Sequence, residues 1–141
     1  MVSMKRFLLI AAAALLSVPC LFAQEQEATP KINKKNLVIK EWNTDAKSKH
    51  RILDHQTTYN ADGKKLEEIE YSTTGQKWRK RYEYGANGKV SRELVYDDRN
   101  KLQTVKKFEY NEFGRKKTQY NYDAKGHLKT IKIFEYITED A

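Results

Sequence analysis

The sequence predicts an all-β fold, an antiparallel meander of seven to eight strands built from repeated β-hairpins. Two observations carry this prediction. From residue 51 to residue 136 a tyrosine recurs four positions before a glycine or asparagine, and tight-turn chemistry follows each tyrosine. No stretch of this region has the i, i+3, i+4, i+7 apolar spacing of an amphipathic helix. The segments between the turns are 8 to 10 residues long, the ordinary length of a strand.

The residues after each tyrosine favour a type I turn closed by a G1 bulge. Their first position is Asn, Asp, Ser or Gly, and their fourth is Gly or Asn. A short polar side chain at the first position accepts hydrogen bonds from the turn backbone, and the fourth position needs a positive φ. The six turns are 60–63, 72–75, 85–88, 97–100, 111–114 and 123–126. They join seven strands, and residues 37–42 suggest one more strand ahead of them.

The first 23 residues have the three parts of a removable export signal. Lys5 and Arg6 give a positive start, residues 7–18 are an apolar run, and Ala23 is the small residue that signal peptidase requires. We therefore expect cleavage after Ala23 and an exported protein, whether periplasmic, at the cell surface or secreted. The apolar run is also short for a membrane span, which needs about 20 residues.

Cys20 is the only cysteine, and it lies inside this signal. The mature chain is therefore expected to have no disulfide, no thiolate metal ligand and no cysteine nucleophile. Lipid attachment at Cys20 is the alternative to cleavage. A bacterial lipobox has Leu three residues before the cysteine and Gly or Ala just before it, whereas this chain has Ser17 and Pro19.

Two segments follow the signal. Residues 24–35 are polar, contain Pro30 and show no apolar periodicity, so we expect a flexible tether. Residues 36–141 are expected to form one hairpin-repeat domain. Residues 101–110 and 127–136 match closely at a spacing of 26, so the repeating unit is a two-stranded hairpin.

Pairing across the turns predicts a register and therefore two faces. It places Tyr82 opposite Arg92, Lys80 opposite Leu94 and Trp78 opposite Tyr96. The same rule places Lys106 opposite Tyr120 and Thr104 opposite Tyr122. It also predicts Tyr84 opposite Val90, Tyr96 opposite Leu102 and Tyr122 opposite Leu128. All even-numbered strand positions from 78 to 136 then share one face, and a single β-bulge near Gln76 and Lys77 changes the parity of the strand before them.

This even face holds most of the aromatic rings and is the candidate ligand-binding surface. Its candidate residues are Trp78, Tyr82, Arg92, Tyr96, Lys106, Tyr120 and Tyr122. A row of Trp78, Tyr96, Leu102, Tyr122 and Leu128 would offer rings that stack on sugar faces, with basic side chains beside them for acidic groups. Packing of this row within the sheet or against a partner subunit is the alternative. Since no helix is available to cover the face, we expect a single solvated or strongly curled layer, with a barrel or sandwich as the competing arrangement.

The segment 120–128 carries a Tyr-x-Tyr-Asp-x-x-Gly-x-Leu pattern, and the segments 82–90 and 108–115 are variants of it with Gly85 and Asn111 in place of the aspartate. The chain from residue 51 to residue 136 thereby resembles the tyrosine-aspartate (YD) repeats of Rhs and teneurin proteins, as a short exported bacterial variant. The resemblance implies β-hairpins with a structural role, and it supplies no catalytic residues. Aspartate follows the tyrosine at Asp97 and Asp123, whereas Asn, Ser or Gly stands there in the other repeats.

The sequence contains no strong motif for catalysis, phosphate binding or metal binding. Ser48, Ser72 and Ser91 lack the Gly-x-Ser-x-Gly setting of a nucleophile, and no glycine loop for phosphate is present. His50, Asp54 and His55 are metal-capable, but positions 50 and 55 of one strand point to opposite faces. Asp97 and Asp98 belong to a turn, which disfavours a glycosidase pair.

We therefore expect no enzyme activity, no cofactor and no metal site, with a hydrolase as the least favoured alternative. The chain has 27 basic and 19 acidic residues, a net charge of +8. Export disfavours nucleic acid as the partner of this charge, and no membrane span is expected after processing. The sequence is most consistent with an exported structural or interaction module. A carbohydrate- or polyanion-binding protein is the alternative, and a cell-envelope glycan or protein is the expected partner.

Overall fold

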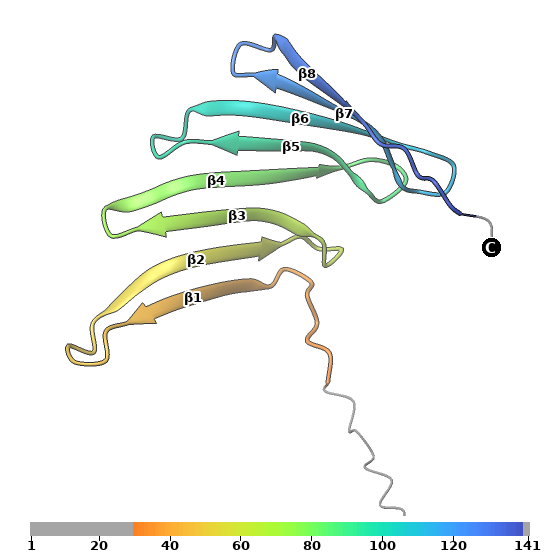
Figure 1. Cartoon of the computed structure of the whole chain (residues 1–141). Coiled ribbons are helices and arrows are strands. Elements are labelled where there is room, and N and C mark those ends of the chain that lie inside the picture. The colour runs from red at the N-terminus through yellow and green to blue at the C-terminus, as the bar shows by residue number, and fades with distance from the viewer. Residues whose placement is uncertain (1–29, 140–141) are drawn as a thin grey trace, which may run out of the picture. The chain divides into compact units, whose positions relative to one another are not determined.

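The computed structural model describes residues 30–139, which form one open antiparallel sheet (Figure 1). The compact unit that contains the sheet is Ile32–Ala141. The predicted export signal, residues 1–23, and residues 24–29 of the predicted tether lie outside the described residues. The prediction of an all-β meander is confirmed, and the described residues contain no helix.

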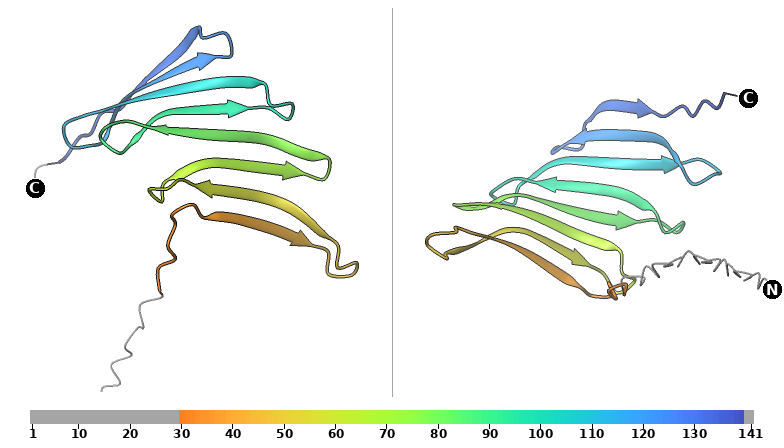
Figure 2. Two further views of the ribbon diagram at one scale, coloured as in Figure 1. Left: turned by 180° about the vertical axis from the view of Figure 1, so that it is seen from behind. Right: turned by 60° about the horizontal axis from the view of Figure 1, so that its bottom comes forward.

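Eight strands follow one another in sequence order, and each pairs only with its neighbours. The strands are β1 (Val38–Thr44), β2 (Arg51–Tyr59), β3 (Lys65–Ser72), β4 (Gly75–Tyr84), β5 (Val90–Tyr96), β6 (Leu102–Tyr110), β7 (Lys116–Asp123) and β8 (Leu128–Ile133). Figure 2 shows the twist of the sheet from behind and from below. Because β1 and β8 do not pair with each other, both edges of the sheet are open.

The sheet is a single layer without a hydrophobic core. No large apolar side chain is buried in the part of the chain that the structure describes, and the one buried residue is Thr57. The expectation of a single layer is therefore confirmed, and the alternative of a barrel or sandwich is wrong. No helix among residues 30–139 is long and apolar enough to cross a membrane.

Five of the six predicted turns share one hydrogen-bonding pattern, of which 60–63 is an example. The Gly63 amide donates to the Asn60 carbonyl at 3.0 Å, and the Asn60 amide donates to the Lys64 carbonyl at 2.8 Å. The Asn60 side-chain oxygen accepts from the Asp62 and Lys64 amides, both at 3.0 Å. The fourth residue has a positive φ in all six turns, with Asn100 at 60° in place of glycine. The predicted turn type is confirmed at these five positions, but at 72–75 it is wrong, because Ser72 pairs directly with Gly75 around a two-residue loop.

Besides the bulges expected at the turns, a β-bulge lies within every pair of strands, not only in the third pair where the sequence predicted one. In each pair one residue of one strand has no partner. The unpaired residues are Asp54, Leu66, Lys77, Ser91, Gln103, Lys117 and Lys129. The bulge predicted near Gln76 and Lys77 is thus confirmed at Lys77. The other bulges were missed because the predicted register was based on the turns alone, and pairing across the turns places all even-numbered positions on one face.

The missed bulges overturn much of the predicted register. Pairs next to the turns are correct, including Tyr84 with Val90, Tyr96 with Leu102 and Tyr122 with Leu128. Beyond each bulge the partners shift by one residue, which exchanges the two faces. The corrected pairs are Tyr82 with Glu93, Lys80 with Val95, Arg79 with Tyr96, Lys106 with Asn121, and Val105 with Tyr122. Trp78 has no partner on β5 and pairs with Glu70 of β3.

Tyrosines at 26-residue intervals fasten each hairpin to the strand before it. The hydroxyl of Tyr84 donates to the Lys65 carbonyl at 2.6 Å, and that of Tyr110 donates to the Val90 carbonyl at 2.6 Å. Tyr136 donates in the same way to the Lys116 carbonyl at 2.7 Å. In each case a cation that directly follows the turn of the preceding hairpin lies over the tyrosine ring. The pairs are Lys64 with Tyr84, Lys89 with Tyr110, and Arg115 with Tyr136. The repeat therefore has a repeated tertiary contact.

The same contact begins at the first hairpin. Lys34, which falls inside the predicted tether, lies over the Tyr59 ring at 5.4 Å. The Asn36 amide also donates to the Asn60 carbonyl at 3.0 Å. Residues just ahead of β1 thus cover the ring that no earlier hairpin reaches.

Tyr110→Phe should lower the free energy of unfolding by about 0.5–1.5 kcal/mol, the usual net value of one hydrogen bond. Tyr122→Phe is the matched control, because the Tyr122 hydroxyl forms no hydrogen bond within residues 30–139. Urea denaturation followed by circular dichroism measures both variants. Equal stability of the two variants would contradict a stabilising role for the tyrosine hydroxyl.

Candidate binding face

The seven predicted ligand-binding residues do not share one face. Cross-strand partners lie on the same face of a sheet, and the observed register divides the seven into two groups. Trp78, Tyr82 and Lys106 belong to one face, which we call the Trp78 face and which also carries His55, Glu68, Glu70, Lys80 and Glu93.

The other group is Arg92, Tyr96, Tyr120 and Tyr122. It belongs to what we call the Tyr122 face, together with Arg79, Leu94, Val105, Lys107, Leu128 and Ile131. The predicted row of Trp78, Tyr96, Leu102, Tyr122 and Leu128 is wrong in its first member, because Trp78 lies on the opposite face. The two candidate binding surfaces must therefore be judged separately.

The Trp78 face holds a hydrogen-bonded polar cluster. His55 Nδ1 lies 2.8 Å from Glu70 Oε2, and the His55 ring meets the Trp78 ring edge-on with 6.1 Å between centroids. Glu68 accepts from Lys65 Nζ at 2.8 Å and from the Tyr82 hydroxyl. Glu68 and His55 are less than a fifth exposed. The polar groups that come closest to an interior are therefore already paired with one another.

The same pairing shifts the titration of this cluster. Burial alone would raise the pKa of Glu68, but hydrogen bonds from Lys65 and Tyr82 outweigh it and hold the pKa below the ordinary 4.5. Burial, followed by the hydrogen bond to Glu68, raises the pKa of the Tyr82 hydroxyl well above its ordinary value. Glu68 is thus an ionised acceptor and Tyr82 a protonated donor at neutral pH.

Most of the predicted binding rings are covered by the protein's own cations. Lys80 lies over Trp78 at 5.0 Å, and Arg79 lies over Tyr96 at 4.2 Å. Lys65 lies near the Tyr82 ring at 6.0 Å. No cation lies over Tyr120 or Tyr122 among residues 30–139. Of the predicted binding rings, these two half-buried ones are without a cation over them, and both are on the Tyr122 face.

Tyr122 lines a recess of about 310 Å³ together with Arg92, Val105, Lys107 and Gly126. We call this the Tyr122 recess. Arg92 Nε lies 3.4 Å from Glu83 Oε2 but has no hydrogen-bond partner within the described chain. No salt bridge to Lys107 is found in the same range. The recess thus combines a tyrosine ring over which no cation of residues 30–139 lies with two cations whose charges are incompletely matched.

Lys107 and Val105 were missed from the sequence because both are odd-numbered. The predicted parity placed them on the face opposite Tyr122, whereas the bulge at Lys117 places Val105 directly opposite it. The regular turn chemistry was the available signal, since every such turn brought one bulge with it.

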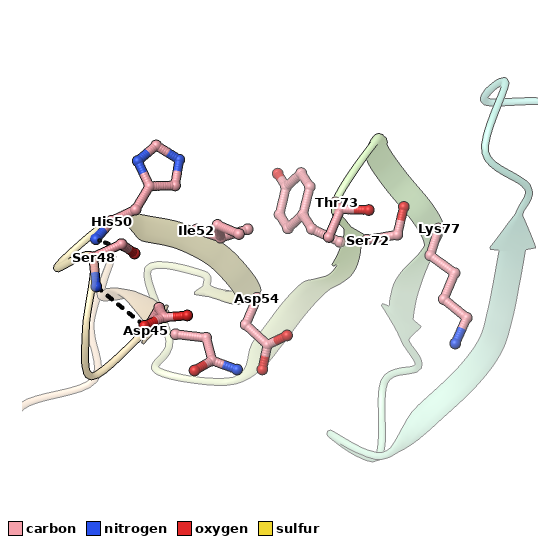
Figure 3. Close-up of a pocket in the computed structure, with 10 residues that line it drawn as sticks. Asp45, Ser48, His50, Ile52, Asp54, Ser72, Thr73 and Lys77 are labelled. Carbon is pink, nitrogen blue, oxygen red and sulfur yellow. Dashed lines mark hydrogen bonds between the residues drawn. The ribbon is translucent and has the colours of Figure 1, made fainter.

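A second recess lies between the β1–β2 connection and the β3–β4 turn (Figure 3). It has a volume of about 740 Å³ and is lined by Asn43, Asp45, Ser48, His50, Ile52, Asp54, Tyr71, Ser72, Thr73 and Lys77. Asp45 Oδ1 accepts from the Lys47 and Ser48 amides at 2.7 and 3.1 Å, and these bonds lower the pKa of Asp45. That carboxylate closes the β1–β2 connection.

The three metal-capable residues noted in the sequence are not brought together. His50 and Asp54 line the second recess but point apart (Figure 3). His55 lies on the Trp78 face against Glu70. Within residues 30–139 no group of three histidine, cysteine or acidic side chains has the arrangement of a metal site.

Comparison with known proteins adds no family. No protein-family model matches the chain, and no curated protein matches it in sequence.

The lowered pKa of Glu68 predicts a loss of stability in acid. A carboxyl whose folded pKa is depressed stabilises the fold above its unfolded pKa and loses this effect as pH falls through the folded pKa. We expect the midpoint of unfolding to fall as the pH drops below about 4.5. Glu68→Gln should be less stable at pH 7 and less sensitive to acid, as measured by thermal melts from pH 7 to pH 2.

Glu112→Gln is the control for this series, because Glu112 is exposed in the β6–β7 turn. It should melt like the wild type at each pH. An unchanged acid response in Glu68→Gln would show that the cluster does not set the pH dependence.

Proposed function

We propose that this protein is an exported, non-catalytic interaction module that binds anionic polymers, acidic glycans above all, through the Tyr122 face. The Tyr122 recess is the observation that carries the proposal. A sugar ring stacks on Tyr122 while Arg92 and Lys107 bind its carboxylate or sulfate. Arginine pairs with such anions through two parallel hydrogen bonds, which adds geometric selection to charge.

The assignment of recognition rather than catalysis rests on the state of the titratable groups. The titratable side chains with the least exposure are paired: Glu93 with Lys80 and Lys106, and His55 with Glu68 and Glu70. Asp97 and Asp123 accept backbone hydrogen bonds in their turns, from Lys101 and His127 respectively, and these bonds lower the pKa of each carboxyl. Such groups hold the fold in place and are poorly suited to transfer protons.

A structural role is the second candidate function, and the open sheet favours it. A single layer leaves large apolar side chains at the surface, where soluble monomers rarely gather them. The resemblance to YD repeats points in the same direction. The two functions are compatible, because a module that assembles into a larger structure still presents one face to a glycan.

Adjacent lysines on opposite faces provide a sharp test of the binding proposal. Lys107 lines the Tyr122 recess, whereas Lys106 lies on the Trp78 face, 3.7 Å from Glu93. Lys107→Gln should weaken retention on an immobilised sulfated polysaccharide about three- to tenfold, and Lys106→Gln should leave it within about twofold of wild type. Retention should also fall steeply with added salt.

Both variants remove one positive charge, so a general effect of net charge would lower retention equally in the two. Equal loss, or no loss in either, would contradict the proposed site. Tyr122→Phe keeps the ring and should bind like the wild type, whereas Tyr122→Ala should not.

A further inference from the structure

The two edge strands are unusually open. Every residue of β1 and of β8 is exposed, and each strand has a neighbour on one side only. An exposed edge with apolar side chains is a template for another strand, and natural sheets usually protect such edges. Neither edge is covered by another part of residues 30–139.

Most exposed apolar side chains of the two edges belong to the same face; the exception is Ile39 of β1, which lies opposite Thr57 and therefore on the Trp78 face. On β8, Ile131 lies opposite Tyr120 and Leu128 opposite Tyr122, which places both on the Tyr122 face, 53% and 47% exposed. On β1, Val38 pairs with Thr58 of β2. Thr58 pairs with Glu67 of β3, and Glu67 pairs with Arg81 of β4. Since Arg81 pairs with Leu94, Val38 is on the Tyr122 face too.

Trp42 shares this face with Val38, because side chains four positions apart in a strand point the same way. Val38 and Trp42 are 47% and 45% exposed. If the edges of two molecules met with equivalent faces aligned, apolar side chains would lie beside one another across the junction.

Strand direction allows this meeting. Directions alternate along the meander, so the strand after β8 would run in the direction of β1. A second molecule displaced along the sheet, without inversion, therefore presents its β1 antiparallel to β8. The two faces of the sheet would continue across the junction.

A strand similar in sequence to β8 already has a neighbour on the side that is open in β8. Residues 127–136, which include β8, repeat residues 101–110, which include β6. The outer edge of β6 pairs with β7 over seven residue pairs. The corresponding edge of β8, with the same pattern of residues, has no strand beside it within residues 30–139.

From these observations we propose that β8 of one molecule pairs with β1 of a second molecule, so that copies of this chain join head to tail into one longer sheet. Different surfaces meet in this contact, so it does not close on itself in a dimer and is expected to produce chains of molecules. This proposal gives the interaction module a partner, a second copy, that is independent of its anionic ligand.

Backbone geometry identifies variants that block one edge each. The Phe134 amide donates to the Lys117 carbonyl, so by alternation the Ile131 amide points outward from β8. The Leu37 carbonyl accepts from the Tyr59 amide, so the Lys40 amide points outward from β1. Ile131→Pro and Lys40→Pro each remove an outward donor and keep the inward hydrogen bonds.

Sedimentation velocity of the purified protein over about 1–200 µM tests the proposal, a range typical of weak association. The wild type should form species larger than dimers as concentration rises. Each proline variant alone should remain monomeric, and their equimolar mixture should form dimers, because one retains β1 and the other retains β8. Circular dichroism checks that both variants are folded.

Three outcomes would overturn the proposal: a wild type that stays monomeric, a mixture that does not dimerise, or self-association of Lys40→Pro alone, which would mean that two β8 edges meet. If a proline variant unfolds, Ile131→Lys replaces it on β8 and Trp42→Lys on β1. Phe113→Lys, in the exposed β6–β7 turn, is the matched control and should associate like the wild type. Lys107→Gln should also associate normally, so a failure of self-association and a failure of anion binding remain distinguishable.

Discussion

Each strand of this sheet contacts only the strands that precede and follow it in the sequence. A single layer has no second layer to pack against, so apolar burial cannot dominate its stability as it does in a two-layer domain. What remains are contacts between neighbouring strands, each worth about 0.2–1 kcal/mol. The regularity of the turns and the recurring tyrosine contacts follow from this constraint, because each hairpin must be fastened to the last one.

The polar cluster on the Trp78 face is a second consequence. Where other proteins would place leucine and valine, this sheet places polar pairs: the Tyr82 hydroxyl donates to Glu68, and His55 is hydrogen-bonded to Glu70. Ionised groups can occupy these positions because water still reaches them from the open side, which lowers the cost of desolvation. Long cationic side chains complete the arrangement by laying their stems over aromatic rings, as Lys80 does over Trp78.

Much of the fold could be predicted from the sequence, because its determinants are local. A turn needs only four residues with suitable chemistry. The turns at 60–63 and 123–126 can therefore be predicted without knowledge of distant partners. The division of residues between faces could not be predicted in the same way. One unpaired residue reverses the side on which all later side chains lie, and the pattern around Ser91 or Gln103 does not distinguish a bulge from regular pairing. The prediction of the candidate site was therefore only partly correct. Tyr122 was identified, Lys107 was missed, and Trp78 was assigned to the wrong face.

The two faces differ in how far their groups satisfy one another, and this difference directs both proposals to the same side. On the Trp78 face Glu68, Glu70 and Glu93 have lysine, histidine or hydroxyl partners, and a lysine lies over the tryptophan. On the Tyr122 face no cation among residues 30–139 lies over the half-buried rings of Tyr120 and Tyr122. Apolar side chains of both edge strands are exposed on this face. Side chains without a partner in the sheet add little to its stability. Binding of another molecule that supplies partners for them is favourable and stabilises the folded sheet. The Trp78 face therefore holds the sheet together, and the Tyr122 face is where we place its interactions with other molecules.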